Sequence, residues 1–422
     1  MHGQWSKPMT DTRLKKKQMK QFDIPNHFRS PVIGRVKEWR RVNDPRKKDF
    51  SPTRMDLGSV ELIIPRHMGF CYGVENAIEI SYRALRENPG KRIFLLSQMI
   101  HNPAVNADLE ALGIRFIMDT EGFQFIPWEE ITKNDVVITP AFGTTVEIEH
   151  MLREKGVELA TYNTTCPFVE KVWKRSAEIG SKGFTVIIHG KYRHEETRAT
   201  FSHSYQNAPS VVVRDRSEAE ELARAIRGEM GREAFFERFA GKCSEGFDPT
   251  TDLRHMGVVN QTTMLASETQ EIADFIREVV TEHHGPGHFA DTRDTLCYAT
   301  NDNQEATLAV LSSEADLALV VGGFNSSNTA QLVTILSARM PVYYIRGEED
   351  FNADAITHFD YENRRECVSK EWIPAHRPLR AVVTSGASCP DAVVEAVMRK
   401  FNALAGGERS LEDAVHHLVQ QG

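Results

Sequence analysis

Three cysteines occupy the same position in a recurring pattern of strand, turn and helix, one in each third of the chain. Cys71 lies in a glycine-flanked turn at residues 69–73, after an apolar run that predicts a strand and before a segment with helical spacing. Cys166 and Cys297 follow the same order of strand, polar turn and helix. Because parallel strands need a crossover that is usually a helix, this recurrence predicts parallel sheets covered by helices.

The three turns also suit a metal centre. Backbone N–H groups and the helix dipole favour negative charge at a helix N-terminus, so each turn could stabilise a thiolate. The chain has no C-x-x-C pair, however, and a cysteine is often a small buried hydrophobic residue. Structural cysteines and a shared metal centre both remain open. If a metal binds, three thiolates suit an iron–sulfur cluster better than closed zinc, because one iron stays free for a substrate.

The other three cysteines, Cys243, Cys367 and Cys389, lack the full strand-to-helix pattern. We interpret Cys243 as part of an irregular insertion, and Cys367 and Cys389 as structural residues.

Small polar residues follow two strands of the last third. Ser326, Ser327 and Asn328 come after one predicted strand, and Ser388 comes after another. Hydroxyl, amide and free backbone N–H groups at helix N-termini form anion sites at the carboxyl ends of parallel strands. Helix capping alone would explain any single one of these residues. Two such loops beside the cysteine turns favour a phosphate or diphosphate site.

His101 and His194 follow strands in the corresponding places of the first and second thirds. Either histidine could be an ordinary surface residue, and Glu196 could be a solvated carboxylate in a charged loop. An acid beside a phosphate pocket could instead relay protons. The sequence pattern by itself leaves both interpretations open.

Composition restricts the class of protein. The chain is 41% hydrophobic and 26% charged, no apolar run approaches the roughly 18 residues of a membrane span, and no secretory signal is recognisable. Six cysteines in 422 residues predict a reducing, cytoplasmic compartment rather than a disulfide framework. Residues 1–55 carry 15 Lys/Arg against 5 Asp/Glu, although the whole chain has a net charge of −8. This basic segment is either a flexible or surface-draped arm, or a docking segment for an acidic partner or RNA.

An ordered set of short segments closely resembles the 4-hydroxy-3-methylbut-2-enyl diphosphate reductase family, most of all its plant and cyanobacterial branch. The segments are Gly-Phe-Cys-Tyr-Gly-Val at 69–74, His-Asn-Pro-x-Val-Asn at 101–106, Thr-Thr-Cys-Pro at 164–167, His-Gly-Lys-Tyr-x-His-Glu-Glu-Thr at 189–197, Asn-Gln-Thr-Thr-Met-Leu at 260–265, Asn-Ser-Ser-Asn-Thr at 325–329 and Ser-Gly-Ala-Ser at 385–388. They run in the family's order over roughly residues 58–404. No plastid transit peptide is recognisable, so we expect a bacterial cytoplasmic enzyme.

The resemblance implies an α/β trefoil, in which three similar domains with parallel-rich sheets surround a central iron–sulfur cluster. We expect a basic N-terminal extension at 1–57, domains at 58–165, 166–295 and 296–405, an insertion in the second domain at about 228–253, and a C-terminal tail at 406–422.

The resemblance also implies a site. Cys71, Cys166 and Cys297 would hold one 4Fe–4S cluster per chain, whose fourth iron would take the substrate's allylic oxygen. Glu196 would deliver protons, and Thr262 would position the surroundings of the hydroxyl-bearing carbon. The residues expected to hold the diphosphate are His101, His194, Ser326, Ser327, Asn328 and Ser388.

The implied reaction is a two-electron reductive dehydroxylation of (E)-4-hydroxy-3-methylbut-2-enyl diphosphate. Its products would be isopentenyl diphosphate and dimethylallyl diphosphate, at the last step of the methylerythritol phosphate route to isoprenoids. The expected electron donor is ferredoxin or flavodoxin, which the basic extension could dock. We expect no nucleic acid or membrane partner.

One departure and two alternatives accompany this interpretation. Phe142 stands where many bacterial members carry a histidine, and Thr144, Thr145 or Lys191 could compensate. A second class of protein is a non-enzymatic iron–sulfur redox sensor with a nucleic-acid-binding arm. A third is a metal-free enzyme acting on phosphate ligands with Cys71 as its nucleophile.

Overall fold

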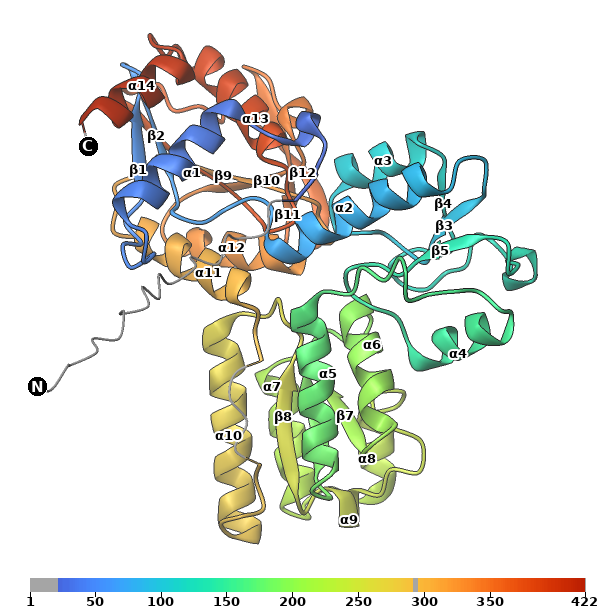
Figure 1. Cartoon of the computed structure of the whole chain (residues 1–422). Coiled ribbons are helices and arrows are strands. Elements are labelled where there is room, and N and C mark those ends of the chain that lie inside the picture. The colour runs from blue at the N-terminus through green and yellow to red at the C-terminus, as the bar shows by residue number, and fades with distance from the viewer. Residues whose placement is uncertain (1–21, 291–294, 422) are drawn as a thin grey trace, which may run out of the picture.

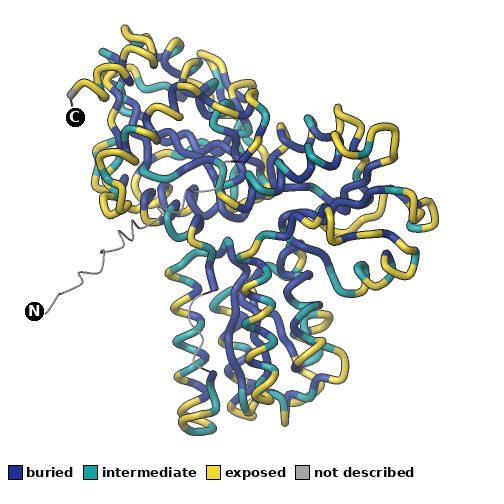
Figure 2. The backbone as a smooth tube through the Cα atoms, in the orientation of Figure 1, coloured by how far each residue is buried: buried dark blue, intermediate teal, exposed yellow. Residues whose placement is uncertain are grey.

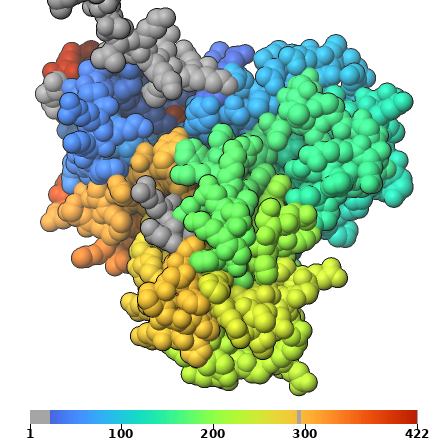
Figure 3. Space-filling view, turned by 60° about the horizontal axis from the view of Figure 1, so that its bottom comes forward, coloured from blue at the N-terminus to red at the C-terminus, as the bar shows by residue number. Residues whose placement is uncertain are grey.

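The structure is a computed structural model that describes residues 22–290 and 295–421, and its elements form three lobes around a common centre (Figure 1). Each lobe has its own sheet flanked by helices, and the coloured surfaces of the lobes meet in the space-filling view (Figure 3). No helix within the described ranges is both long and apolar enough to span a membrane.

The first lobe holds a three-stranded parallel sheet in the order β4-β3-β5. Its elements are α2 (Tyr72–Glu87), β3 (Ile93–Leu95), α3 (Pro103–Ala111), β4 (Ile114–Phe116), the 3₁₀ helix η2 (Trp128–Glu130), β5 (Val136–Ile138) and α4 (Val146–Glu154). As predicted, Asn102 caps α3 by accepting a hydrogen bond from the Val105 N–H at 3.2 Å, and Pro103 opens the helix.

The second lobe holds a three-stranded parallel sheet in the order β7-β6-β8. Its elements are α5 (Pro167–Gly180), β6 (Thr185–His189), α6 (Glu195–Tyr205), β7 (Ser210–Val213), α7 (Arg216–Ile226), α8 (Arg232–Arg238), α9 (Pro249–Asp252), β8 (Met256–Asn260) and α10 (Ala266–His284). The segment predicted as an irregular insertion contains α8 and α9, and its Phe235, Phe239 and Phe247 are buried in the core of this lobe. The aromatic residues thus anchor a segment whose two helices are short, and its description as an insertion stays a prediction.

The third lobe holds a five-stranded sheet in the order β1-β2-β13-β9-β10, in which only β1 runs antiparallel. Its elements are η1 (Asn26–Phe28), α1 (Pro31–Asn43), β1 (Thr53–Asp56), β2 (Val60–Ile64), α11 (Tyr298–Val310), β9 (Leu317–Val321), α12 (Ser327–Ser337), β10 (Val342–Ile345), η3 (Glu348–Asp350), β13 (Leu379–Ser385), α13 (Asp391–Ala405) and α14 (Leu411–Gln421). A separate antiparallel hairpin is formed by β11 (Ala355–Asp360) and β12 (Arg365–Lys370).

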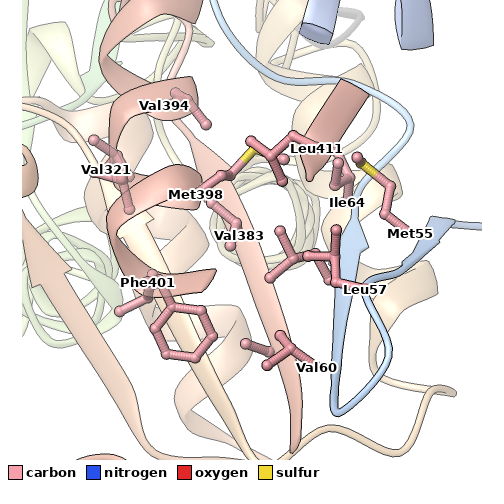
Figure 4. Close-up of a cluster of buried hydrophobic side chains, with 14 of the residues drawn as sticks. Met55, Leu57, Val60, Ile64, Val321, Val383, Val394, Met398, Phe401 and Leu411 are labelled. Atoms are coloured by element: carbon pink, nitrogen blue, oxygen red, sulfur yellow. The ribbon is translucent and has the colours of Figure 1, made fainter. Parts of the chain in front are cut away.

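The central strand β9 shows why the strands of the third-lobe sheet have continuous apolar sequences. Leu319 and Val321 face one core cluster, and Ala318 and Val320 face the other. A strand buried on both faces needs apolar residues at every position. Figure 2 shows a buried interior in each of the three lobes, and Figure 4 shows Met398 and Phe401 of α13 near Val383 in one of the two clusters. The predicted three-part α/β fold with parallel-rich sheets is confirmed.

The described part of the N-terminal extension is not a flexible arm, so that interpretation was wrong. Val32, Ile33 and Val36 lie on one face of α1 and are buried in the core of the third lobe. Ser30 caps this helix by accepting a hydrogen bond from the Ile33 N–H at 2.8 Å. Helical spacing and a cap were therefore present in a segment that its basic composition made look irregular. Residues 1–21 lie outside the described ranges, and a docking role for the extension stays a prediction.

The first domain boundary also needs correction. The strand before the first cysteine, β2, was assigned to a domain at 58–165, but it pairs with β13 through Leu62 and Ala381 in the sheet of the third lobe. The chain therefore begins in the third lobe and returns to it. The other domain boundaries stay predictions.

The burial of α1 leads to a first test. Ile33→Ala should lower the free energy of unfolding by about 2–5 kcal/mol, because a fully buried side chain of the third-lobe core is truncated. Val42→Ala removes a side chain that is 65% exposed on the same helix and should change it by less than about 0.5 kcal/mol. Urea unfolding followed by circular dichroism measures both. Equal stability of the two variants would contradict the packing of α1 as a core helix.

Candidate functional site

Each of the three cysteines lies where the chain passes from one lobe to the next. Cys71 connects β2 of the third lobe to α2 of the first, and Cys166 precedes α5 of the second lobe. Cys297 lies between α10 of the second lobe and α11 of the third. Each is the N-cap residue of the helix that follows. The predicted strand-to-helix turn is confirmed at Cys71, but it was wrong for Cys166 and Cys297, where α4 and α10 are the preceding elements among the described residues.

A cavity of about 80 Å³ lies at this centre, enough for several water-sized groups. Its wall contains every residue that the sequence predicted for the site, namely Cys71, His101, Cys166, His194, Glu196, Thr262, Cys297, Ser326, Ser327, Asn328 and Ser388. Apolar side chains such as Val74, Ile100 and Val169 complete the lining. The structure thus brings the predicted residues together, while their roles stay predictions.

Gly73, in the first turn of α2, makes room for two of the sulfur atoms. A Cβ atom at this position would lie 2.7 Å from the Cys166 Sγ and 3.9 Å from the Cys71 Sγ. The first contact is far inside van der Waals distance, so only glycine lets α2 begin against the sulfur of another lobe. Any larger residue at position 73 would therefore push the Cys166 sulfur out of its place beside Cys71.

Burial controls the charge of the thiols. It raises the pKa of Cys71 to about 12, with a further contribution from the neighbouring Cys297, and it raises the pKa of Cys166 to about 11. Backbone N–H groups of the following helices oppose this shift, for example that of Phe168 beside Cys166, but they are weaker than the loss of hydration. The expected stabilisation of thiolates by the helix N-termini is thus present, but burial outweighs it. A bound cation would be needed to make the thiolates the favoured form.

Within the described ranges, no group of three or more His, Cys, Asp or Glu side chains is arranged to hold one metal ion. The three sulfur atoms instead face a shared cavity from three separate helix ends.

Two buried donors face the cavity without a partner among the described residues. The His194 Nδ1 accepts a hydrogen bond from the Glu196 N–H at 3.2 Å. Burial holds the pKa of His194 well below its usual range, so the neutral ring carries its proton on Nε2, which is buried and unpaired. The Nδ2 amide of Asn328 is also buried and unpaired. Such donors are costly without an acceptor, so they favour an anionic ligand at this wall.

The remaining polar residues of this wall are held by local contacts. Ser326 caps α12 and accepts a hydrogen bond from the Thr329 N–H at 3.3 Å. The Asn328 Oδ1 accepts one from the Ala387 N–H at 2.8 Å, and the Ser388 hydroxyl donates to the His101 carbonyl at 3.2 Å. These bonds tie the two polar loops of the third lobe to a first-lobe turn. The N-terminus of α12 thereby opens onto the cavity, as an anion site requires.

Glu196 is a buried acid in the wall of the same cavity. The Thr262 N–H lies 2.5 Å from its Oε1, and the Thr262 hydroxyl lies 3.0 Å from its Oε2. Burial raises the pKa of Glu196 to about 7, although both hydrogen bonds from Thr262 lower it. The side chain is therefore protonated below neutral pH and can give up that proton, which are the properties of a general acid.

Sequence reasoning missed Glu195. Its Oε2 lies 3.1 Å from the His101 Nε2, both side chains are buried, and the contact joins the first and second lobes. Because a carboxylate only accepts, this contact places a proton on His101 Nε2. The two residues are 94 positions apart, and no local pattern could have paired them.

Phe142, which stands where many bacterial family members carry a histidine, packs against two histidines of the cavity. Its ring stacks on His101 at a centroid distance of 4.3 Å and meets His194 edge to face at 5.6 Å. It orients two polar rings but offers no hydrogen bond. Of the residues predicted to compensate, Thr145 uses its hydroxyl to cap α4 by accepting from the Ile148 N–H at 3.4 Å.

Fold and site together define a class of protein: a three-lobed α/β protein with three cysteines and a set of anion donors around one central cavity. The chain belongs to the LytB protein family, whose sequence model matches residues 62–402. The resemblance inferred from the short segments is thereby confirmed.

Relatives from cyanobacteria share more than a third of their residues with this chain. The chain is 39% identical over 356 residues to a protein of Trichormus variabilis, covering 83% of this chain and 86% of the relative. It is 38% identical over 358 residues to one of Synechococcus sp. (strain CC9605), covering 83% and 88%. Both are named 4-hydroxy-3-methylbut-2-enyl diphosphate reductase.

Two solved structures share the fold. One is an (E)-4-hydroxy-3-methyl-but-2-enyl diphosphate reductase, described as the terminal enzyme of the non-mevalonate pathway, with 25% identity, a TM-score of 0.50, and coverage of 82% of this chain and all of the other. The other is the E-1-hydroxy-2-methyl-but-2-enyl-4-diphosphate reductase of Plasmodium falciparum, at a TM-score of 0.60 and 18% identity over 87% of this chain and 99% of the other. None of these relatives supports the alternative of a nucleic-acid-binding sensor.

The close approach of Gly73 to the Cys166 sulfur gives a second test. Gly73→Ala should lower the free energy of unfolding by about 1–3 kcal/mol, because the added methyl group forces the Cys166 sulfur to move. Gly34→Ala makes the same change inside α1, where a Cβ would meet nothing within 4 Å, and should be neutral or stabilising by up to about 1 kcal/mol. Urea unfolding compares them. A Gly73→Ala protein as stable as the Gly34→Ala protein would show that the sulfur is not confined as described.

Proposed function

We propose that this protein reduces (E)-4-hydroxy-3-methylbut-2-enyl diphosphate to isopentenyl diphosphate and dimethylallyl diphosphate. This two-electron reductive dehydroxylation is the last step of the methylerythritol phosphate route to isoprenoids. The observation that carries the proposal is one cavity in which three thiols face unpaired anion donors and a buried acid. The names of the LytB relatives agree with it.

Cys71, Cys166 and Cys297 would hold one 4Fe–4S cluster per chain. Their sulfur atoms come from three helix ends, lie on one cavity wall and are accommodated by a glycine. The irons of a cluster take their cysteine ligands separately, so the sulfurs need not converge on a single ion. When bound, such a cluster supplies electrons and a Lewis-acidic iron without a cysteine ligand, at which a substrate hydroxyl group can be activated.

The diphosphate group would lie against the N-terminus of α12. The His194 Nε2–H and the Asn328 Nδ2–H supply the two unpaired donors. His101, Ser326, Ser327 and Ser388 would complete the set from the same wall. A phosphate offers many acceptor oxygens, so it can satisfy donors that neutral groups leave unpaired.

Glu196 would deliver the proton that the reduced carbon skeleton requires. Thr262 holds both carboxyl oxygens and so fixes the direction in which the acidic proton is presented. The apolar residues Val74, Ile100 and Phe142 line the same cavity and would keep water away from a bound substrate. With water excluded, protonation depends on the positioned acid rather than on solvent.

Electrons would come from ferredoxin or flavodoxin. Tyr72 and Tyr298 follow Cys71 and Cys297 directly, and their side chains are 41% and 38% exposed. The Tyr298 hydroxyl accepts a hydrogen bond from the Tyr72 N–H at 3.2 Å, so these residues form one surface beside two of the cysteines. A small electron carrier bound there would lie close to the sulfur atoms.

All six cysteines are free thiols. This state fits a reducing compartment, and we place the reaction in the bacterial cytoplasm.

The metal content tests the proposal most directly. Protein purified without oxygen should contain about four irons and four acid-labile sulfides per chain. Cys71→Ser, Cys166→Ser and Cys297→Ser should each lose or damage the cluster, whereas Cys243→Ser and Cys367→Ser alter thiols outside the cavity and should retain it. A wild-type protein that cannot be loaded with iron and sulfide would refute the proposal.

The pH dependence tests Glu196. Because burial raises its pKa to about 7, the proton-donating form predominates below that pH, and kcat should fall as pH rises through 7. Glu196→Gln cannot donate this proton and should lower kcat by about 10²- to 10⁴-fold with little change in KM. Glu178→Gln, at a surface carboxylate paired with Arg175, serves as the control. Steady-state turnover between pH 6 and 9 measures both, and full activity of Glu196→Gln would contradict this role.

A further inference from the structure

The cavity wall is short of positive charge for a diphosphate ligand. No Lys or Arg is among the lining residues in the described part of the chain. His194 is neutral, because burial keeps its pKa well below the usual range, and Phe142 contributes an apolar ring. His101 faces the carboxylate of Glu195 at 3.1 Å, so this pair adds no net positive charge to the wall. A diphosphate carries several negative charges, and its transfer out of water is unfavourable unless a cation pairs with it. A cation at the edge of the wall would therefore be expected.

Lys191 supplies an ammonium group at this edge. It lies in the loop between β6 and α6 of the second lobe, where its backbone N–H donates to the Gln261 Oε1 at 3.0 Å. Its Nζ donates to the Ser327 hydroxyl at 3.1 Å and to the Tyr361 hydroxyl at 2.7 Å. Ser327 is itself a lining residue at the start of α12. The ammonium group is thus one hydrogen bond away from the proposed phosphate position.

The hydrogen-bond partners of the ammonium group are neutral hydroxyl groups, and its charge also acts on the carboxylate of Glu268, where burial raises the pKa and Lys191 opposes that rise. Within the described ranges, Lys191 forms no ion pair with a carboxylate, and Tyr361 presents both its hydroxyl group and its ring, whose centroid lies 5.3 Å from Nζ. Two of the three ammonium hydrogens are accounted for by the hydroxyl groups of Tyr361 and Ser327. Because its hydrogen-bond partners are neutral and no carboxylate pairs with it directly, this positive charge remains available to an anion that approaches Ser327.

The charge of Lys191 already acts on the cavity. Together with the neighbouring His101, it is one of the influences that hold the pKa of His194 low, after burial. The two threonines considered as alternatives do not have this position. Thr145 caps α4, and neither Thr144 nor Thr145 is among the lining residues.

We propose that Lys191 is a binding residue for the diphosphate group and supplies the positive charge that Phe142 does not. Tyr361 holds the ammonium group beside Ser327 until phosphate oxygens replace it as partner. Because Lys191 belongs to the second lobe and Ser327 and Tyr361 to the third, the bound anion also links these two lobes. This inference rests on the proposed function, since it assigns a further residue to the same site.

Inorganic pyrophosphate is the probe for this role, because its binding needs no turnover. Titration calorimetry on anaerobically purified holoprotein should show about 10- to 100-fold weaker binding by Lys191→Met, the range expected when a charged hydrogen bond is lost. Binding by Lys191→Met should also depend less on ionic strength. Lys191→Arg keeps the charge and should stay within about 3-fold of wild type. Lys182→Met removes an exposed lysine of the same lobe and should have no effect.

Two further measurements separate a binding role from a structural one. Tyr361→Phe removes a competing partner of the ammonium group and should bind pyrophosphate as tightly as wild type or more tightly. Lys191→Met should raise KM for the diphosphate substrate by about the same factor as the pyrophosphate Kd, while kcat stays within about 3-fold. Iron content and circular dichroism equal to those of wild type show that the variants are folded.

The possible outcomes distinguish this inference from the proposed function. Equal pyrophosphate affinity of wild type and Lys191→Met, or no pyrophosphate binding by wild type, would overturn the role of Lys191. Loss of binding in both Lys191→Met and Lys191→Arg with altered circular dichroism would also overturn it, in favour of a structural role. If pyrophosphate binding depends on Lys191 but wild type does not reduce the substrate, the anion role stands and the reductase proposal fails.

Discussion

The site depends on the three places where the chain crosses between lobes, since each crossing carries one cysteine. Cys71, Cys166 and Cys297 each begin the helix that enters the next lobe. None of the lobes contains a complete site, because each contributes only part of the cavity wall. The close approach of Gly73 to the Cys166 sulfur shows how tightly two of these crossings are packed. The site therefore forms only when the three lobes pack against one another.

Loss of hydration governs the chemistry of this cavity. Burial raises the pKa values of Cys71 and Glu196 and lowers that of His194, so in each case the neutral form gains. Neutral hydrogen-bond donors such as the His194 ring can bind an anion without changing their protonation state. A protonated carboxyl group such as that of Glu196 can serve as an acid. The charged partners of such a cavity must come from outside its lining, as a bound metal centre or as a cation such as Lys191 at the edge.

Local sequence signals predicted the elements of the fold, and contacts between distant residues could not be predicted from them. The cap at Asn102 and the turn at Cys71 could be recognised because each depends on a few neighbouring residues. The same signals at Ser30 were present but were masked by the basic composition around them. The pairing of Leu62 with Ala381, and of His101 with Glu195, depends on how whole lobes pack. Cysteine spacing alone did not show whether the three cysteines share one site. The resemblance to a family was needed to predict that they do.

The return of the chain to its first lobe has a consequence for biosynthesis. Figure 1 shows the blue elements near the beginning of the described chain beside the red ones at its end, in the lobe where β2 pairs with β13. The sheets of the other two lobes are built from residues 93–138 and 185–260, so they can form while the chain is still being synthesised. Strands β1 and β2 are synthesised early, but β2 cannot pair with β13 until that strand, the last one in the chain, has been synthesised. The third lobe, and with it the central cavity, is therefore complete only near the end of synthesis. A ligand or metal centre can bind in this cavity only after that point.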